Sequence, residues 1–153
     1  MRVHLVRHGE ALPRDVDPGR GLSDVGRRGA EKVAAFLERQ AIEVEAVWES
    51  GRKRATQTAE IMASAVRSKE GVVCQPGMAP NDPVVPIVEK LASLEGDYML
   101  VGHLPFLSIL ASQLILGRAE PDVVNFPAAA LVCLDRGPSG RWAVSWMVTP
   151  DLV

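Results

Sequence analysis

Short, almost wholly apolar runs of strand length are the feature of this sequence that most restricts its fold. The run Val3–Val6 stops at Arg7, and the run Tyr98–Val101 stops at Gly102 and His103. Apolar runs of about four to eight residues are typical of strands buried on both faces, as the strands of parallel sheets are. Such strands need helices over both faces of their sheet, so the runs favour an α/β architecture.

The segments between these runs have the character of helices and turns. Ser23 is a suitable N-cap for an amphipathic helix, and Pro105 suits the first turn of another. The patterns predict strands at 3–6, 44–48, 72–74, 98–101, 128–134 and 142–147, and helices at 23–39, from Gly51 through Val66, from a cap at Asn81 or Asp82 through Leu94, and at 105–114. This order predicts a mainly parallel sheet with helices on both faces and a C-terminal antiparallel hairpin turning at Gly137–Gly140.

Composition narrows the function classes. The chain has 153 residues, 47% hydrophobic and 24% charged, which predicts a single domain over residues 1–153. Its formal charge of -2 does not favour a nucleic-acid partner, and no apolar run is long enough for a membrane span. The charged N-terminus is unlike a signal peptide, so we expect a cytoplasmic protein. Cys74 and Cys133 lack metal-ligand spacing and are expected to be reduced, packed thiols.

Polar residues that could carry chemistry collect where the expected strands end. In open α/β sheets, ligands bind beyond the carboxyl ends of the strands. Two of the three histidines fall at such ends, together with several arginines, and the segments concerned are Arg7–Glu10, Ser50–Arg54 and Gly102–His103. The third histidine, His4, lies inside the first strand and is expected to be a packed or edge side chain. The sequence therefore predicts one polar site at this edge of the sheet.

These residue types suit phosphoryl transfer. Arginine forks bind phosphoryl oxygens bidentately, and helix N-termini add oriented N–H groups. A neutral histidine nitrogen such as that of His8 can attack phosphorus, while a second histidine donates a hydrogen bond to an equatorial oxygen. Gly9 removes a side chain where the backbone turns and a phosphate approaches.

Four motifs together resemble a known family over essentially the whole chain. They are Val6–Ala11 (VRHGEA), Leu22–Gly26 (LSDVG), Ser50–Ala59 (SGRKRATQTA) and Leu100–Pro105 (LVGHLP), and Trp146–Pro150 is similar to the family's end. The sequence resembles the histidine phosphatase superfamily, which has the phosphoglycerate-mutase-like fold, and more narrowly the small SixA-type phosphohistidine phosphatases. Gly51 departs from the family, which usually has proline there, and this predicts a looser loop. Ser50 is expected only to shape that loop.

The resemblance implies a role for each matching residue. His8 of the Arg-His-Gly (RHG) motif would be the phosphorylated nucleophile. The phosphate pocket would consist of Arg7, Arg54 and His103, with Arg20 and Gly9 as further substrate-binding residues. The expected enzyme is a metal-independent phosphatase, and no cofactor is predicted.

The predicted site offers two candidates for a general acid. Larger members of the family carry a glutamate that protonates the leaving oxygen; here Asp82 is the nearest candidate and Glu10 is another. For each carboxylate, capping, solvation or loop structure is the alternative role. Imidazole, with a pKa of about 6.5, leaves without a strong acid, whereas an alkoxide requires one. The chain also lacks the insertions that build a lid in larger members, and an open site suits a phosphorylated side chain on a protein surface. The absence of a clear acid and the absence of a lid both favour phosphohistidine over a small phosphate ester.

The expected function is therefore a cytoplasmic phosphohistidine phosphatase in signal transduction. Its partner would be a phosphohistidine-containing protein, such as a phosphorelay or phosphotransferase component. One alternative is a phosphomonoesterase or mutase of the same superfamily that acts on small molecules. Others are a non-catalytic phosphate-binding module, and a metal site formed by His8, His103 and a carboxylate, which the surrounding arginines disfavour.

Overall fold

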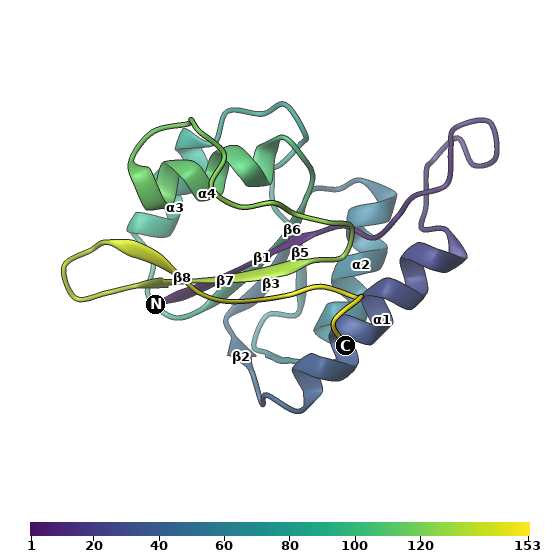
Figure 1. Ribbon diagram of the computed structural model, residues 1–153, viewed down its shortest axis with the longest axis horizontal. Coiled ribbons are helices and arrows are strands. Elements are labelled where there is room, and N and C mark those ends of the chain that lie inside the picture. The colour runs from purple at the N-terminus through teal and green to yellow at the C-terminus, as the bar shows by residue number, and fades with distance from the viewer.

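A central six-stranded sheet runs through the computed structural model, which describes residues 1–153 (Figure 1). Its strand order is β5-β3-β6-β1-β7-β8. The strands are β1 (Arg2–Arg7), β3 (Ala46–Glu49), β5 (Val72–Cys74), β6 (Tyr98–Gly102), β7 (Leu131–Arg136) and β8 (Trp142–Val148). The first four are parallel, whereas β7 pairs antiparallel with β1 and β8 antiparallel with β7. The predicted mainly parallel sheet with a C-terminal antiparallel hairpin is confirmed.

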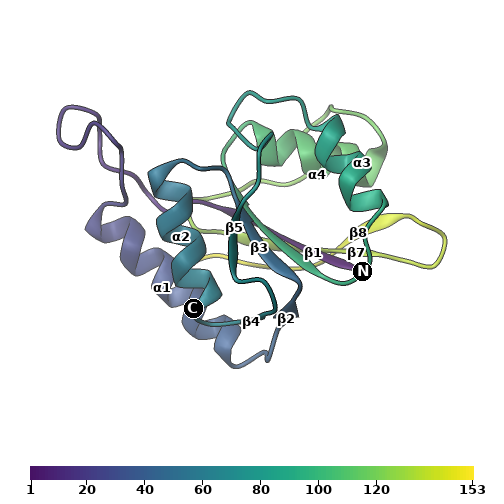
Figure 2. The same ribbon diagram turned by 180° about the vertical axis from the view of Figure 1, so that it is seen from behind.

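Two pairs of helices cover the two faces of this sheet (Figures 1 and 2). The pair on one face is α1 (Asp24–Glu38) and α2 (Lys53–Ala63), and the pair on the other is α3 (Val85–Ala92) and α4 (Phe106–Leu116). Alternate residues of the central strands enter different cores. Val101 packs in the core beneath α1 and α2, whereas Leu100 packs in the core beneath α3 and α4. The apolar runs thus reflect strands buried on both faces.

The helix starts show where local signals succeed and where they fail. Ser23 caps α1 as expected, because its hydroxyl accepts a hydrogen bond from the Gly26 N–H at 3.0 Å. The expected cap of α3 by Asn81 or Asp82 is wrong. The N-cap of α3 is Val84, without a side-chain hydrogen bond, and the Asp82 carboxylate instead accepts from the Ala79 N–H within the preceding loop.

The strand expected at residues 44–48 is in fact two strands. A short strand, β2 (Glu43–Val44), pairs with β4 (Arg67–Ser68) in a separate two-stranded sheet, and β3 begins only at Ala46. Glu45 marks the break, because its N–H donates to the Asp97 carbonyl and its carboxylate pairs with Lys69. The expected helix through Val66 also ends early, at Ala63, because the chain then turns into β4.

The remaining expectations concern the thiols and the third histidine. Cys133 is buried, but Cys74 on the edge strand β5 is exposed, so the expectation of two packed thiols is wrong for Cys74. His4 is packed as expected, with 2% of its surface exposed and its ring beside that of Trp146. No helix in the structure has the length and apolar character needed to cross a bilayer.

Candidate active site

The carboxyl ends of β1 and β6 bring the two remaining histidines together. The two strands are parallel neighbours, with Arg7 opposite Gly102 in the register. The His8 N–H donates to the Gly102 carbonyl at 3.0 Å, and the ring centroids of His8 and His103 lie 5.0 Å apart. Two segments almost a hundred residues apart in the chain therefore form one site because their strands end side by side.

The protonation state of His8 follows from its two ring contacts. Its Nδ1 lies 2.6 Å from the Gly9 carbonyl oxygen, which can only accept, so Nδ1 carries the proton. Its Nε2 accepts from Arg54 Nε at 3.3 Å and thus presents a lone pair. Burial, aided by the charges of Arg54 and Arg7, lowers the pKa of His8 to about 4, although the bond to Gly9 acts in the opposite direction. His8 is therefore a neutral imidazole at neutral pH.

Arg7 is anchored by a residue distant from it in the sequence. Its Nη1 donates to the Phe126 carbonyl at 2.7 Å, whereas its buried Nε has no hydrogen-bond partner in the protein. Burial also lowers the pKa of Arg7. A half-buried guanidinium with a free Nε–H is a suitable donor for an anionic oxygen beside His8.

His103 is buried, with only 1% of its surface exposed, and it contacts Ser50. Ser50 Oγ lies 2.5 Å from His103 Nε2 and also accepts a long hydrogen bond, at 3.4 Å, from the Arg52 N–H. Donation of the Ser50 hydroxyl proton to Nε2 leaves one buried group unpaired, the Nδ1–H of His103. The other tautomer would leave both Nδ1 and the hydroxyl proton without partners, so the structure favours Nδ1–H. Burial, followed by the charges of His8, Arg54 and Arg52, lowers the pKa of His103 to about 3.

Glu49 secures the turn that carries Arg54 into the first turn of α2. Gly51 has a φ of +83°, which proline cannot adopt. The Gly51 N–H, which proline lacks, donates to the buried Glu49 carboxylate at 2.6 Å, and Thr56 Oγ1 donates to the same carboxylate at 2.8 Å. The departure from proline therefore comes with a hydrogen bond that fixes this loop instead of loosening it.

Gly9 is required by a close backbone approach. A Cβ at this position would lie 2.6 Å from the Gly26 carbonyl oxygen of α1. The Gly9 N–H donates to Thr58 Oγ1 at 3.1 Å, and that hydroxyl donates to the Arg54 carbonyl at 2.8 Å. Thr58, which is fully buried, thus joins the backbone of the histidine loop to the helix that carries Arg54.

The loop that carries Arg20 projects beyond α1 and α2 (Figure 1). The Asp17 carboxylate organises it by accepting from the N–H groups of Gly19 and Gly21 and from Lys53 Nζ on α2, the last at 2.8 Å. Arg20 has a left-handed φ of 51°, and its Nε donates to the Leu12 carbonyl at 3.2 Å. Its charge contributes to the lowered pKa of His8.

The two candidate acids are engaged in local contacts. The Glu10 carboxylate is exposed and accepts from the Ser23 hydroxyl at 2.9 Å, at the start of α1. The Asp82 carboxylate accepts from the Ala79 N–H at 2.8 Å. Neither carboxylate hydrogen-bonds to the histidines or to an arginine of the site. No group of three or more His, Cys, Asp or Glu side chains is arranged to hold a metal ion.

Comparison with known proteins supplies the family. Residues 3–78 match the histidine phosphatase superfamily (branch 1). The chain is also 26% identical to the phosphohistidine phosphatase SixA of Escherichia coli (strain K12), over 98% of this chain and 94% of that protein. The chain belongs to the histidine phosphatase superfamily. Another relative is an uncharacterised protein of Picosynechococcus, 30% identical over 90% of this chain and 86% of its own.

Solved structures agree with this assignment to the histidine phosphatase superfamily. The fold matches SixA complexed with tungstate with a TM-score of 0.86, at 26% identity and over 99% of both chains. It matches the putative SixA of Agrobacterium tumefaciens with a TM-score of 0.78, at 25% identity and over 97% of both chains. The expected family and phosphoglycerate-mutase-like fold are confirmed, and the protein is a phosphatase.

Proposed function

We propose that this phosphatase removes phosphoryl groups from histidine side chains of proteins through a phosphohistidine intermediate on His8. The observation that carries the proposal is the neutral His8 imidazole, whose Nε2 lone pair lies beside Arg54 while its Nδ1–H is held by Gly9. Similarity to proteins described as phosphohistidine phosphatases supports the choice of substrate. The substrate would be a phosphohistidine-containing protein in the cytoplasm, such as a phosphorelay or phosphotransferase component.

In the first step, His8 Nε2 attacks phosphorus in line with the bond to the leaving group. The new N–P bond forms as the substrate's P–N bond breaks, and a substrate ring protonated on its other nitrogen leaves as neutral imidazole. Arg7, Arg54 and Arg20 bind the equatorial oxygens, and the His103 Nδ1–H donates to one of them. In the second step, water attacks the same phosphorus, the N–P bond to His8 breaks, and inorganic phosphate departs with the remaining proton lost to solvent.

The leaving group distinguishes phosphohistidine from a phosphate ester. An alkoxide must be protonated as it leaves, whereas imidazole, with a pKa of about 6.5, leaves as a stable neutral ring. Asp82 and Glu10 each accept a local hydrogen bond, and neither hydrogen-bonds to a histidine or an arginine of the candidate site. These contacts support a phosphoramidate substrate, which needs no strong acid, over an alkyl ester.

Turnover of a phosphohistidine protein, measured beside aryl and alkyl phosphates, tests this proposal. We expect the phosphohistidine protein and the aryl phosphates to react much faster than the alkyl phosphates. Asp82→Asn should scarcely slow the phosphohistidine reaction, whereas His8→Ala should abolish turnover of every substrate. Efficient hydrolysis of an alkyl phosphate with phosphohistidine left intact would overturn the substrate assignment, and selective loss of alkyl turnover in Asp82→Asn would make Asp82 the general acid.

A further inference from the structure

Positive charge is concentrated in the segments that carry the active-site residues. The segments 7–22 and 50–57 contain six basic and three acidic residues, in a chain whose formal charge is -2. Beyond the arginines placed at the phosphate, these segments hold three outer cations, Arg14, Arg52 and Lys53, which we call the basic rim. Arg14 and Arg52 are exposed and form no ion pair, whereas Lys53 is paired with Asp17.

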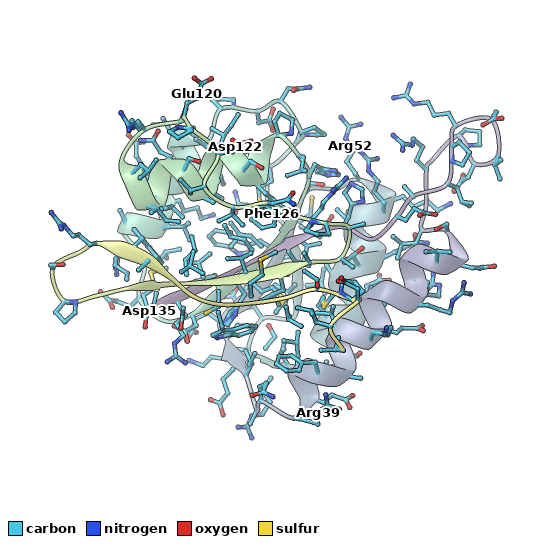
Figure 3. The ribbon with its side chains drawn as sticks, in the orientation of Figure 1. Arg39, Arg52, Glu120, Asp122, Phe126 and Asp135 are labelled. Carbon is cyan, nitrogen blue, oxygen red and sulfur yellow. The ribbon has the colours of Figure 1, made fainter.

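Arg52 is connected to both histidines through its neighbours. It precedes α2, and its N–H donates to the Ser50 hydroxyl that contacts His103. Two residues further on, Arg54 contacts His8. The Arg52 side chain projects away from the body of the molecule (Figure 3). Arg52 therefore stands beside the active-site residues, and its side chain forms no hydrogen bond or ion pair with them.

Arg14 lies near the tip of the projecting loop. Hydrogen bonds from the N–H groups of Val16 and Asp17 to the Pro13 carbonyl fold the tip of this loop around Arg14. The Asp17–Lys53 contact of 2.8 Å holds the loop against the start of α2. Burial, followed by the charges of Arg20, Arg52 and Arg14, lowers the pKa of Arg54, so both outer arginines lie near enough to Arg54 for their charges to act on it. Asp15 is the one acidic side chain of the loop tip that makes no hydrogen bond or ion pair, and it is exposed.

We propose that the basic rim recognises acidic side chains that flank the phosphohistidine of the substrate protein; this inference rests on the proposed function. A small phosphate ester is neutralised by the inner arginines and does not extend to exposed groups outside the pocket. A protein substrate does extend past the pocket, and its flanking residues then meet Arg14 and Arg52. Such exposed ion pairs raise the rate of encounter and set substrate preference, and salt weakens them.

Synthetic phosphohistidine peptides of equal length provide the test, with glutamate, serine or lysine on both sides of the phosphohistidine. Two exposed ion pairs change kcat/KM by about threefold each, so glutamate should be favoured over serine by about tenfold at low salt. The preference should shrink at 0.5 M salt, which reduces the Debye length to a few ångströms. The double variant Arg14→Gln/Arg52→Gln should lose the preference and keep wild-type turnover of an aryl phosphate.

A matched control is Arg39→Gln, which removes an exposed arginine from the C-terminal end of α1, at the end of the molecule opposite to Arg52 (Figure 3). This variant should retain the preference for glutamate.

Three results would overturn the inference without refuting the proposed function. Equal kcat/KM for the three peptides with wild-type enzyme would remove the basic rim from recognition while leaving the proposed function intact. An unchanged glutamate preference in the double variant would assign the preference to other residues. Stronger competition by a single-stranded oligonucleotide than by a glutamate-rich peptide would assign the basic rim to nucleic acid. Failure to hydrolyse any phosphohistidine peptide, with aryl phosphate still hydrolysed, would instead refute the proposed function and the inference with it.

Discussion

Acid should destabilise this protein through its histidines, all three of which resist protonation in the folded state. Burial is the main cause in each case, and it lowers the pKa of His4 and His8 to about 4 and that of His103 to about 3. In the unfolded chain each should titrate near the ordinary value of about 6.5. Between the folded-state and unfolded-state pKa values, the unfolded chain therefore binds more protons than the folded protein.

The sign of the effect follows from which state takes up protons. Above about pH 6.5 both states are neutral at the histidines, and the stability of the folded state is fully present. As the pH falls below that value, the unfolded chain gains protons while the native state does not, so unfolding becomes more favourable. Each histidine lowers the free energy of unfolding by about 2 kcal/mol between pH 7 and pH 5, or about 6 kcal/mol for all three. That loss is comparable with the whole stability of a small domain, about 5–15 kcal/mol.

Urea unfolding followed by tryptophan fluorescence at pH 7 and pH 5, at fixed ionic strength, measures this difference. His4→Gln is the informative variant, because His4 lies outside the active site. Whatever its effect on stability at pH 7, this substitution should remove about a third of the pH dependence of the free energy of unfolding. A free energy of unfolding that stays constant between pH 7 and pH 5 would refute the reasoning. A direct check is NMR titration of the three rings, which should show no protonation near pH 6.

Three substitutions test contacts of the site. Arg54→Lys keeps the charge but loses the planar fork, so kcat/KM for an aryl phosphate should fall about a hundredfold, and a rate close to wild type would deny a bidentate contact. Ser50→Ala should lower kcat while changing KM little, and it should shift the ¹⁵N resonances of His103, because the ring loses the hydroxyl that fixes its tautomer. Ser50→Thr should restore both properties. Unchanged resonances in Ser50→Ala would count against a positioning role for Ser50. Thr58→Val leaves the Gly9 N–H buried without its partner, so the free energy of unfolding, measured in urea at pH 7, should drop by about 1–3 kcal/mol. A much smaller loss would mean that this N–H finds another acceptor.

The elements that depend on local pattern were predictable from the sequence. The apolar run Tyr98–Val101 and the Ser23 cap both correspond to observed elements, because buried strands and N-caps are encoded by a few adjacent residues. The β2–β4 pair was not predictable, since each strand has only two residues and is defined by its distant partner. The expected capping of α3 by Asp82 was wrong for a similar reason, because the direction of the loop decides which N–H this carboxylate meets.

The candidate site likewise has features that were predictable from the sequence and contacts that were not. The meeting of His8 and His103 follows from one rule, that parallel strands present their carboxyl ends at one edge. The contacts that orient these groups come from elsewhere in the fold. The carbonyl that holds Arg7 belongs to Phe126, 119 residues away, and nothing local to either segment indicates that contact. Ser50 could have been suspected of a direct role from its position after a strand end, where the other polar residues of the site collect.

The most direct test of the account is the identity of the phosphorylated atom during turnover. Enzyme quenched rapidly at alkaline pH after mixing with substrate should carry phosphate that is labile in acid and stable in base, located on His8 by mass spectrometry. Because Nδ1 of His8 is committed to the Gly9 carbonyl, NMR of the trapped phosphoenzyme should place the phosphorus on Nε2. Phosphate on Nδ1 of His8 or on another residue, or full turnover by His8→Ala, would contradict the account.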